Sequence, residues 1–308
     1  MNYSALLRTI PSLLAIMLIG YTGARRGKLG PGFTKSASYL VSNILLSCSI
    51  FNSICGNVPD LSGDLILKAL LIMTASLAVC FIVSGISTII VKRRGYDPAP
   101  FELSLSIVNA LLIGLPIIQQ VYGDLAVLYT GLFAVPLNLL LYTYGVWRLD
   151  STGSSAGGGF KMKTIMTPCT IVTLIAIFLF AFRVRVPGVI LQFSTYVGSA
   201  TVPMSMIVIG TMMASEGLMD AFFDKRVYLL CFIRLILTPL IAWPVITVLT
   251  DDIVLIRTAV ILAACPCGMV IPILSLQYGH DPMLSSRSVL VSTLFSMMTL
   301  PMWVYFVG

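Results

Sequence analysis

The sequence predicts an all-α polytopic membrane protein with ten transmembrane helices in two five-helix repeats of inverted topology, in which helices four and nine are broken and cross each other. Three observations predict this fold. Of the 308 residues, 58% are hydrophobic and only 10% are charged, whereas about 25% are charged in a typical soluble domain. Apolar runs of the roughly 20 residues that a spanning helix needs are separated by short polar breaks. Finally, the chain matches itself at an offset of 156 residues.

The apolar runs define ten candidate spans, each bounded by charged residues, Gly or Pro. They cover residues 4–24, 35–56, 65–91, 101–122, 125–147, 164–182, 189–214, 226–249, 253–277 and 285–307. A Gly/Ser-rich tract, LDSTGSSAGGGFKMK, lies about half-way along the chain, and its composition is typical of a flexible linker. We therefore expect a first repeat at 1–148, a cytoplasmic linker at 149–163 and a second repeat at 164–308.

The basic residues predict the orientation of these spans. Thirteen Lys and Arg residues lie in the connections that follow odd-numbered spans, five lie on the opposite side, and Arg234 lies inside span eight. The side with more Lys and Arg is normally cytoplasmic. We expect both termini outside and the central linker in the cytoplasm. Because the basic residues occupy these short connections, the net charge of +7 does not indicate a nucleic-acid partner.

The offset of 156 residues aligns the two halves without a gap. The matched pairs include Pro31 with Pro187, Gly32 with Gly188, Pro116 with Pro272, Tyr122 with Tyr278, and Gly123 with Gly279. Because five spans are an odd number, the second copy enters the membrane from the opposite side. Inverted repeats of this kind are typical of secondary transporters, and paired interrupted helices indicate their binding site.

Spans four and nine carry these interruptions. A proline removes one backbone N–H and clashes with a carbonyl of the preceding turn. The polar groups released in this way are tolerated in a membrane only inside protein or beside a watery cavity. Helix N-termini at such a break favour an anion, and released carbonyls can hold a cation. A proline kink that serves packing alone is the alternative interpretation.

Span four reads NALLIGLPIIQQVYG (109–123) and span nine begins CPCGMVIPILSLQYG (265–279). Together with TP (167–168), VGSATVPMSMIVIG (197–210) and RLILTPL (234–240), these segments resemble the auxin efflux carrier family over essentially the whole chain. The chain departs from the family pattern at Ser47, where the family often has proline, and at Cys267.

The resemblance implies a scaffold of spans 1, 2, 6 and 7, and a transport domain of spans 3–5 and 8–10 that moves like an elevator. It also implies a homodimer formed through the first spans of each half. The implied substrates are small organic anions, namely auxin in plant members and malonate, malate or similar carboxylates in bacterial relatives. The short linker resembles the compact bacterial form, which places the chain in the cell inner membrane.

Thirteen residues are candidates for the substrate site. Asn109 matches the crossover Asn of the family, and its amide can both donate and accept. Arg234 either attracts the anion, extends to the membrane interface or makes a structural pairing. The serines of span two either face the substrate or bond their own helix. The full set is Ser47, Ser49, Asn109, Gly114, Pro116, Gln119, Gln120, Arg234, Pro266, Cys267, Gly268, Pro272 and Gln277.

The Cys-Pro-Cys sequence at 265–267 raises the question of a metal, because thiolates select Cu(I). Metal pumps with an intramembrane motif of this kind also need large soluble domains, for which the chain offers no segment. We therefore expect no metal and no cofactor. No Asp or Glu lies near the centre of a predicted span, which disfavours proton coupling through a carboxylate. Sodium coupling and ion-independent transport both remain open.

The sequence therefore predicts a secondary transporter of a small organic anion, with the lipid bilayer and a second copy of the chain as its partners. The first alternative is a sodium-coupled symporter of the bile-acid type, which shares the crossed helices. The second is a membrane sensor that binds without transporting. An enzyme is not expected, because the sequence has no paired carboxylates, metal-ligand cluster or nucleophile–His arrangement.

Overall fold

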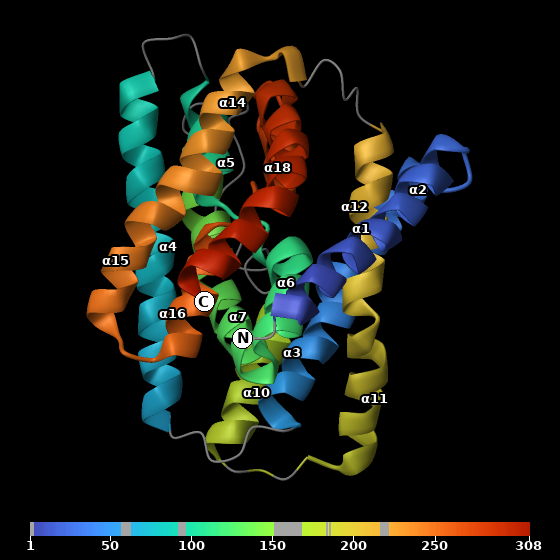
Figure 1. Cartoon of the computed structure of the whole chain (residues 1–308), viewed down its shortest axis with the longest axis vertical. Coiled ribbons are helices and arrows are strands. Elements are labelled where there is room, and N and C mark those ends of the chain that lie inside the picture. Colours follow the sequence, from blue (N-terminus) through green and yellow to red (C-terminus); the bar gives the residue numbers. More distant parts are fainter. Residues whose placement is uncertain are drawn as a thin grey trace. The chain divides into compact units, whose positions relative to one another are not determined.

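The computed structural model describes residues 3–56, 63–91, 97–150, 168–182, 184, 186–215 and 222–308 (Figure 1). Within these residues the regular structure is helical, apart from one antiparallel bridge between Val108 and Cys267. The chain is therefore an all-α protein. Most of the predicted linker, 151–163, lies outside the described residues, whereas Leu149 and Asp150 still belong to a helix.

Helices occupy each of the ten predicted ranges. In the first half they are α1 (Tyr3–Arg25), α2 (Pro31–Leu40), the π-helical η1 (Val41–Leu45), α3 (Leu46–Cys55), α4 (Gly63–Val91), α5 (Pro98–Ser106), η3 (Ala110–Gly114), α6 (Leu115–Tyr122), α7 (Asp124–Leu140), η4 (Leu141–Gly145) and α8 (Val146–Asp150). In the second half they are α10 (Pro168–Ala181), α11 (Gly188–Ser199), α12 (Thr201–Ser215), α14 (Lys225–Phe232), η5 (Ile233–Leu237), α15 (Thr238–Leu249), α16 (Ile253–Ala263), α17 (Val270–Gln277) and α18 (Met283–Val307).

Among the described residues, five helical segments are long and apolar enough to cross a membrane. They are Asp64–Ile90, Asp124–Asp150, Gly188–Thr211, Lys225–Leu249 and Met283–Val307. Shorter apolar helices include Ala110–Tyr122 and Ile253–Ala263, which are halves of the broken spans four and nine. These helices have the length and composition of a protein that crosses the membrane several times.

The chain divides into two compact units. Unit 1 comprises Met1–Leu70, Leu111–Val135 and Met166–Leu218, and unit 2 comprises Leu71–Ala110, Pro136–Ile165 and Met219–Gly308. Unit 1 therefore contains spans 1, 2, 6 and 7, and unit 2 contains most of span 3 and spans 8, 9 and 10. Spans 4 and 5 contribute to both units. The two sequence repeats follow a different division, and their boundaries remain a prediction.

Unit 1 is held together by close backbone contacts between its helices. A Cβ built on Gly20 of α1 would lie 2.1 Å from the carbonyl oxygen of Ile207 in α12, and one on Gly210 would lie 2.0 Å from that of Met17. These glycines let α1 and α12 approach each other at two levels, as small residues do between membrane helices. Elsewhere in the unit, α3 packs against α10 and α11.

In unit 2 the helices are joined by single polar and aromatic contacts. The indole N–H of Trp303 in α18 donates to the carbonyl of Leu235 in η5 at 2.8 Å. The Ser76 hydroxyl of α4 donates to the carbonyl of Ala259 in α16 at 3.3 Å. Such bonds satisfy backbone groups that lipid could not, so they fix which helices are neighbours in this unit.

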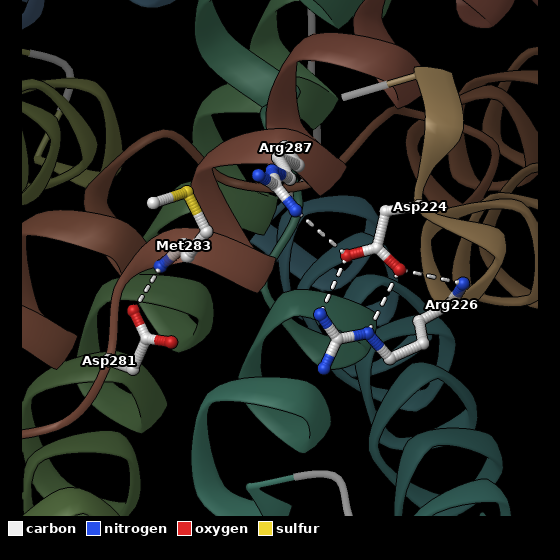
Figure 2. A network of polar contacts seen from close by, with 5 residues as sticks. All are labelled: Asp224, Arg226, Asp281, Met283 and Arg287. Atoms are coloured by element: carbon white, nitrogen blue, oxygen red, sulfur yellow. Dashed lines mark hydrogen bonds and ion pairs between the residues drawn. The ribbon is translucent and has the colours of Figure 1, made fainter. Parts of the chain in front are cut away.

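One end of unit 2 gathers the charged residues. Asp224 precedes α14 and binds Arg226 (2.8 Å) and Arg287 of α18 (3.2 Å), as Figure 2 shows. His280, which follows α17, has one ring nitrogen 2.7 Å from a carboxylate oxygen of Asp97, the residue before α5, and the other 2.9 Å from the carbonyl of Leu149 in α8. We call this the Asp224 end.

The opposite end of unit 2 holds the start of α16 and the end of α18, because Arg257 donates to the carbonyl of Val307 at 3.2 Å. The starts of α5, α14 and α18 are therefore grouped with the ends of α8 and α17, away from the start of α16. This grouping is the one that spans of alternating direction require.

The helix breaks recur at matching positions in the two halves. Helix α5 ends at Ser106 and α16 ends at Ala263, so the separation of these two ends differs from the offset of 156 by one residue. The following half-helices end at Gly123 (φ 76°) and Gly279 (φ 79°), which are separated by that offset. Since positive φ favours glycine, the repeated Tyr-Gly pair marks the same helix end in each half.

Of the prolines in the two broken spans, Pro266 lies at a break, whereas Pro116 and Pro272 do not, which corrects the interpretation from the sequence. The helices stop at Ser106 and Ala263, whereas Pro116 and Pro272 lie in the first turns of α6 and α17. The first turn of a half-helix has no intrahelical acceptor for its N–H groups, so proline is well tolerated at Pro272. Pro272 therefore lies at the start of its half-helix, whereas Pro116 follows the π-helical turn η3 inside the half-helix Ala110–Tyr122.

Candidate functional site

The two breaks meet in unit 2 and pair through their backbones. The N–H of Asn109 donates to the carbonyl of Pro266 at 2.8 Å, and the N–H of Gly268 donates to the carbonyl of Ile107 at 2.8 Å. Val108 and Cys267 lie opposite each other between these bonds, and the two segments run antiparallel. We call 107–109 and 266–268 the crossover.

Gly268 makes this close approach possible. A Cβ at this position would lie 2.9 Å from Cγ2 of Ile107 and 3.2 Å from its carbonyl oxygen. The first contact is shorter than a side chain tolerates, and Cγ2 of a β-branched residue moves little. The predicted involvement of Gly268 is therefore steric, since it lets the two backbones pair.

Arg234 connects the ends of both broken helices. Its Nε donates to the carbonyl of Cys265 at 2.9 Å, just beyond α16, and its Nη1 donates to the carbonyl of Leu105 at 3.1 Å, at the end of α5. The last carbonyls of a helix lack intrahelical partners and carry partial negative charge. The guanidinium of Arg234 satisfies one carbonyl near each of these two ends.

The contacts of Arg234 are those of a structural pairing, one of its three predicted roles. Its side chain is fully buried, and Arg234 lies nine residues after Lys225, the first residue of α14. That separation is about 14 Å along a helix, near half of a hydrocarbon core of about 30 Å. Its guanidinium is held inside unit 2 by the carbonyls of Cys265 and Leu105, and Arg234 stays a candidate for attracting an anion.

Two buried hydrogen-bond donors at the crossover have no partner among the described residues. They are Nη2 of Arg234 and Nδ2 of Asn109, which is only 6% exposed. No carboxylate of the described chain pairs with Arg234 within salt-bridge distance. A buried charge without a counter-ion is costly, and a buried donor without an acceptor is also unfavourable. Each of these donors could bind an acceptor group of a ligand.

The Cys-Pro-Cys sequence acts through its backbone. The carbonyls of Cys265 and Pro266 accept from Arg234 and Asn109, and the N–H of Cys267 donates to the hydroxyl of Ser292 at 3.2 Å. Both thiols are free and buried, and the Cys265 thiol faces the carbonyl of Ile261 at 3.3 Å. In the described part of the chain, no three His, Cys, Asp or Glu side chains cluster as metal ligands do.

The two serine candidates of span two belong to unit 1 and make contacts within it. Ser47 and Ser49 are buried in unit 1, where the Ser47 hydroxyl donates to the carbonyl of Asn43 at 2.7 Å. A Cβ on Gly198 of α11 would lie 2.9 Å from the Cα of Ser49. Ser47 thus bonds its own helix and Ser49 lies close to α11, and contact of either serine with a substrate remains a prediction.

The residues that follow the breaks differ in exposure. Gly114 and Pro116 are buried, Gln119 is half-buried and Gln120 is exposed, and all four belong to unit 1. In unit 2, Pro272 is half-buried in the first turn of α17, and Gln277 is the last residue of that helix. Their contact with a substrate remains a prediction.

Two features of unit 2 were not found from the sequence. The first is that Glu102 of α5 is buried and paired, accepting from Arg148 at 3.0 Å and from the Tyr144 hydroxyl. The second is a row of buried serines along α18 at Ser285, Ser288, Ser292 and Ser296. The helical spacing of these serines is visible in SSRSVLVSTLFS (285–296), so that pattern could have indicated a polar helix face.

Comparison with known proteins gives the chain a family. A model of the family described as membrane transport protein matches residues 6–157 and 155–304, which together cover most of the chain. An uncharacterized transporter of Methanothermobacter thermautotrophicus is 25% identical over 302 residues, covering 96% of both chains. One of Methanocaldococcus jannaschii is 24% identical, covering 94% of this chain and 95% of the relative. The chain therefore belongs to the membrane transport protein family, that of the auxin efflux carriers, and is a multi-pass membrane transporter and not an enzyme.

Proposed function

We propose that the protein is a secondary transporter that carries a small organic anion and binds its carboxylate at the crossover. The observation that carries this proposal is the pair of unpartnered buried donors, Nη2 of Arg234 and Nδ2 of Asn109. Both atoms donate and neither can accept, so they favour an acceptor-only group such as a carboxylate. The charge of Arg234 adds an electrostatic preference, because charge-assisted hydrogen bonds are about twice as strong as neutral ones.

The same residue weighs against the sodium-coupled alternative. A sodium ion at broken helices would use their last carbonyls, and Arg234 already donates to the carbonyls of Leu105 and Cys265. A second cation beside a buried guanidinium would also be repelled. We therefore propose that substrate binding at the crossover does not require sodium. The guanidinium of Arg234 occupies the helix-end carbonyls that a sodium ion would otherwise use.

Three observations support the inverted repeat that we propose for the fold. The crossover segments run antiparallel, as two repeats that enter the membrane from opposite sides require. The breaks and the left-handed glycines recur at the offset of 156 residues. The helix packing in unit 1 is also symmetric between the halves. Span one packs on span seven, and span six, the equivalent of span one, packs on span two.

We propose an elevator mechanism in which unit 2 carries the crossover while unit 1 stays fixed. The support is that Asn109, Arg234, Cys267 and Gly268 all belong to unit 2, whereas spans 1, 2, 6 and 7 belong to unit 1. In this mechanism the protein is a homodimer in the cell inner membrane. The Asp224 end then faces the cytoplasm, with both termini outside, as the distribution of Lys and Arg predicts.

A thermal-shift screen of small organic acids tests the binding site. A ligand that binds only the folded protein raises its melting temperature in proportion to affinity and concentration. We expect a carboxylate to stabilise the wild-type protein equally in sodium and in potassium buffers. The shift should be lost in Asn109→Ala and in Arg234→Met, because each variant removes one of the two donors.

The matched control is Asn43→Ala, because the amide of Asn43 already donates to the carbonyl of Tyr39 at 3.0 Å in unit 1. This control should keep the full shift. If Arg234→Met does not fold, Asn109→Ala alone decides. A shift that survives in Asn109→Ala, or one that appears only with sodium, would exclude the proposed site.

A further inference from the structure

One face of α18 is lined with buried hydroxyl groups. Ser285, Ser288, Ser292 and Ser296 follow a helical spacing of three, four and four residues, so they lie on one side of the helix. All four are fully buried. The N–H of Cys267 donates to the Ser292 hydroxyl, so this serine face is directed toward the crossover.

The four hydroxyls differ in their hydrogen bonding. Ser292 and Ser296 donate to carbonyls of their own helix, those of Val289 at 3.3 Å and Thr293 at 2.7 Å. This is the usual arrangement for serine in a membrane helix. The hydroxyls of Ser285 and Ser288 have no partner among the described residues. A buried hydroxyl without a partner costs free energy, so these two groups indicate a ligand.

The helices that pack against α18 carry hydroxyls of the same kind. Both α5 and α17 contact α18, and they also contact each other. Ser104 of α5 and Ser275 of α17 are fully buried, and neither hydroxyl has a partner in the described part of the chain. Three mutually packed helices thus share four unsatisfied buried hydroxyls. We call this region the serine seam.

The serine seam extends from the Asp224 end to the crossover. Ser285 lies in the first turn of α18, two residues before Arg287, which binds Asp224. Seven residues later, Ser292 contacts the backbone of the crossover. Seven residues of helix span about 10 Å, a length that about three hydrogen-bonded oxygen atoms bridge.

We propose that a file of buried water molecules occupies the serine seam and hydrates the crossover from the Asp224 end. Water suits these groups because every hydroxyl can both donate and accept, and buried water typically makes about three hydrogen bonds. A cation suits them less, since the seam supplies no carboxylate and Arg234 lies at the crossover. A water-lined path is also one of the settings in which a broken helix is tolerated within a membrane.

Thermal unfolding of the substrate-free protein tests this proposal independently of the transported anion. If water binds Ser288, Ser288→Ala removes its hydrogen bonds, and the melting temperature should fall by about 2–4 °C. If the seam is dry, the same change removes an unsatisfied hydroxyl, and the melting temperature should stay equal or rise. Ser285→Ala should behave like Ser288→Ala.

The matched control is Ser296→Ala on the same face, whose hydroxyl is already satisfied by the carbonyl of Thr293. Its melting temperature should change by less than about 1 °C. A second measurement decides if the alanine variants do not fold or shift within error. Ser288→Cys, in a background with the seven native cysteines replaced by serine, should react with Ag⁺ from aqueous solution.

The control for labelling is Leu290→Cys, which lies on the same helix away from the serine face and is also buried. It should remain unreactive. An unreactive Ser288→Cys, or a melting temperature of Ser288→Ala equal to or above that of the wild type, would overturn the proposal.

Discussion

At the scale of single residues, the Cys-Pro-Cys sequence contributes backbone groups to the crossover and not metal-binding thiolates. Cys265 and Pro266 contribute carbonyl oxygens, Cys267 contributes an N–H, and the thiols pack inside the protein. Arg234 acts on two helix ends that lie 31 and 129 residues away in the sequence. No local pattern predicts such distant partners, so the capping role of Arg234 is visible only in the folded chain.

The steric role of Gly268 leads to a prediction at this scale. Gly268→Ala would place a methyl group 2.9 Å from Cγ2 of Ile107. We expect a loss of about 1–3 kcal/mol of stability, the usual cost of overpacking, together with impaired ligand binding. Thermal unfolding and the ligand-induced shift measure the two effects.

The control for this prediction is Gly85→Ala in the middle of α4, where a Cβ would meet nothing within 4 Å. Alanine is the better helix former by about 1 kcal/mol, so this variant should be at least as stable as the wild type. A Gly268→Ala protein with wild-type stability and ligand shift would show that the backbones do not need this close approach.

At the scale of helices, the sequence predicted where spans lie better than where they break. All ten predicted ranges contain helices, because apolar length is a strong local signal. The breaks were expected near Pro116 and Pro272, but the helices end at Ser106 and Ala263. The backbone pairing of 107–109 with 266–268 fixes those positions, and such pairing depends on tertiary structure.

The Asp224 contacts give a prediction at the scale of helices, because they join α14 to α18 (Figure 2). Hydrogen bonds from Arg226, and further from Arg287, lower the pKa of Asp224 to about 2 from its usual 3.8. This folded-state pKa lies below the unfolded value, so the stabilisation is complete above about pH 4 and is lost as the pH falls toward 2. Asp224→Asn should remove about 1 kcal/mol at pH 6, since two partly exposed ion pairs are lost.

Thermal unfolding between pH 3 and 7 measures this effect. The difference between wild type and Asp224→Asn should narrow as the pH approaches 3. The control is Asp281→Asn, because Asp281 accepts from the N–H of Met283 at 2.9 Å, a bond drawn in Figure 2 that asparagine can keep. A difference for Asp224→Asn that stays constant across this pH range would contradict the assigned ion pairs.

At the scale of the whole molecule, the candidate site was predicted in part. Asn109, Arg234 and residues 266–268 lie together in unit 2, as the repeated interruption of two spans indicated. Ser47 and Ser49 belong to unit 1, where Ser47 bonds its own helix and Ser49 lies close to Gly198 of α11. The sequence could not separate these groups, because a buried serine that bonds its own helix and one that contacts a ligand have the same local pattern.

The central claim is that the crossover binds an organic anion and carries it across the membrane. Counterflow of labelled malonate or malate in proteoliposomes tests it most directly. We expect the wild-type protein and Asn43→Ala to accumulate label against unlabelled substrate without sodium, and Asn109→Ala to lose at least about tenfold in rate, since about 1.4 kcal/mol of lost binding is a tenfold change. Binding of these acids without exchange, or exchange by Asn109→Ala at the wild-type rate, would contradict the claim.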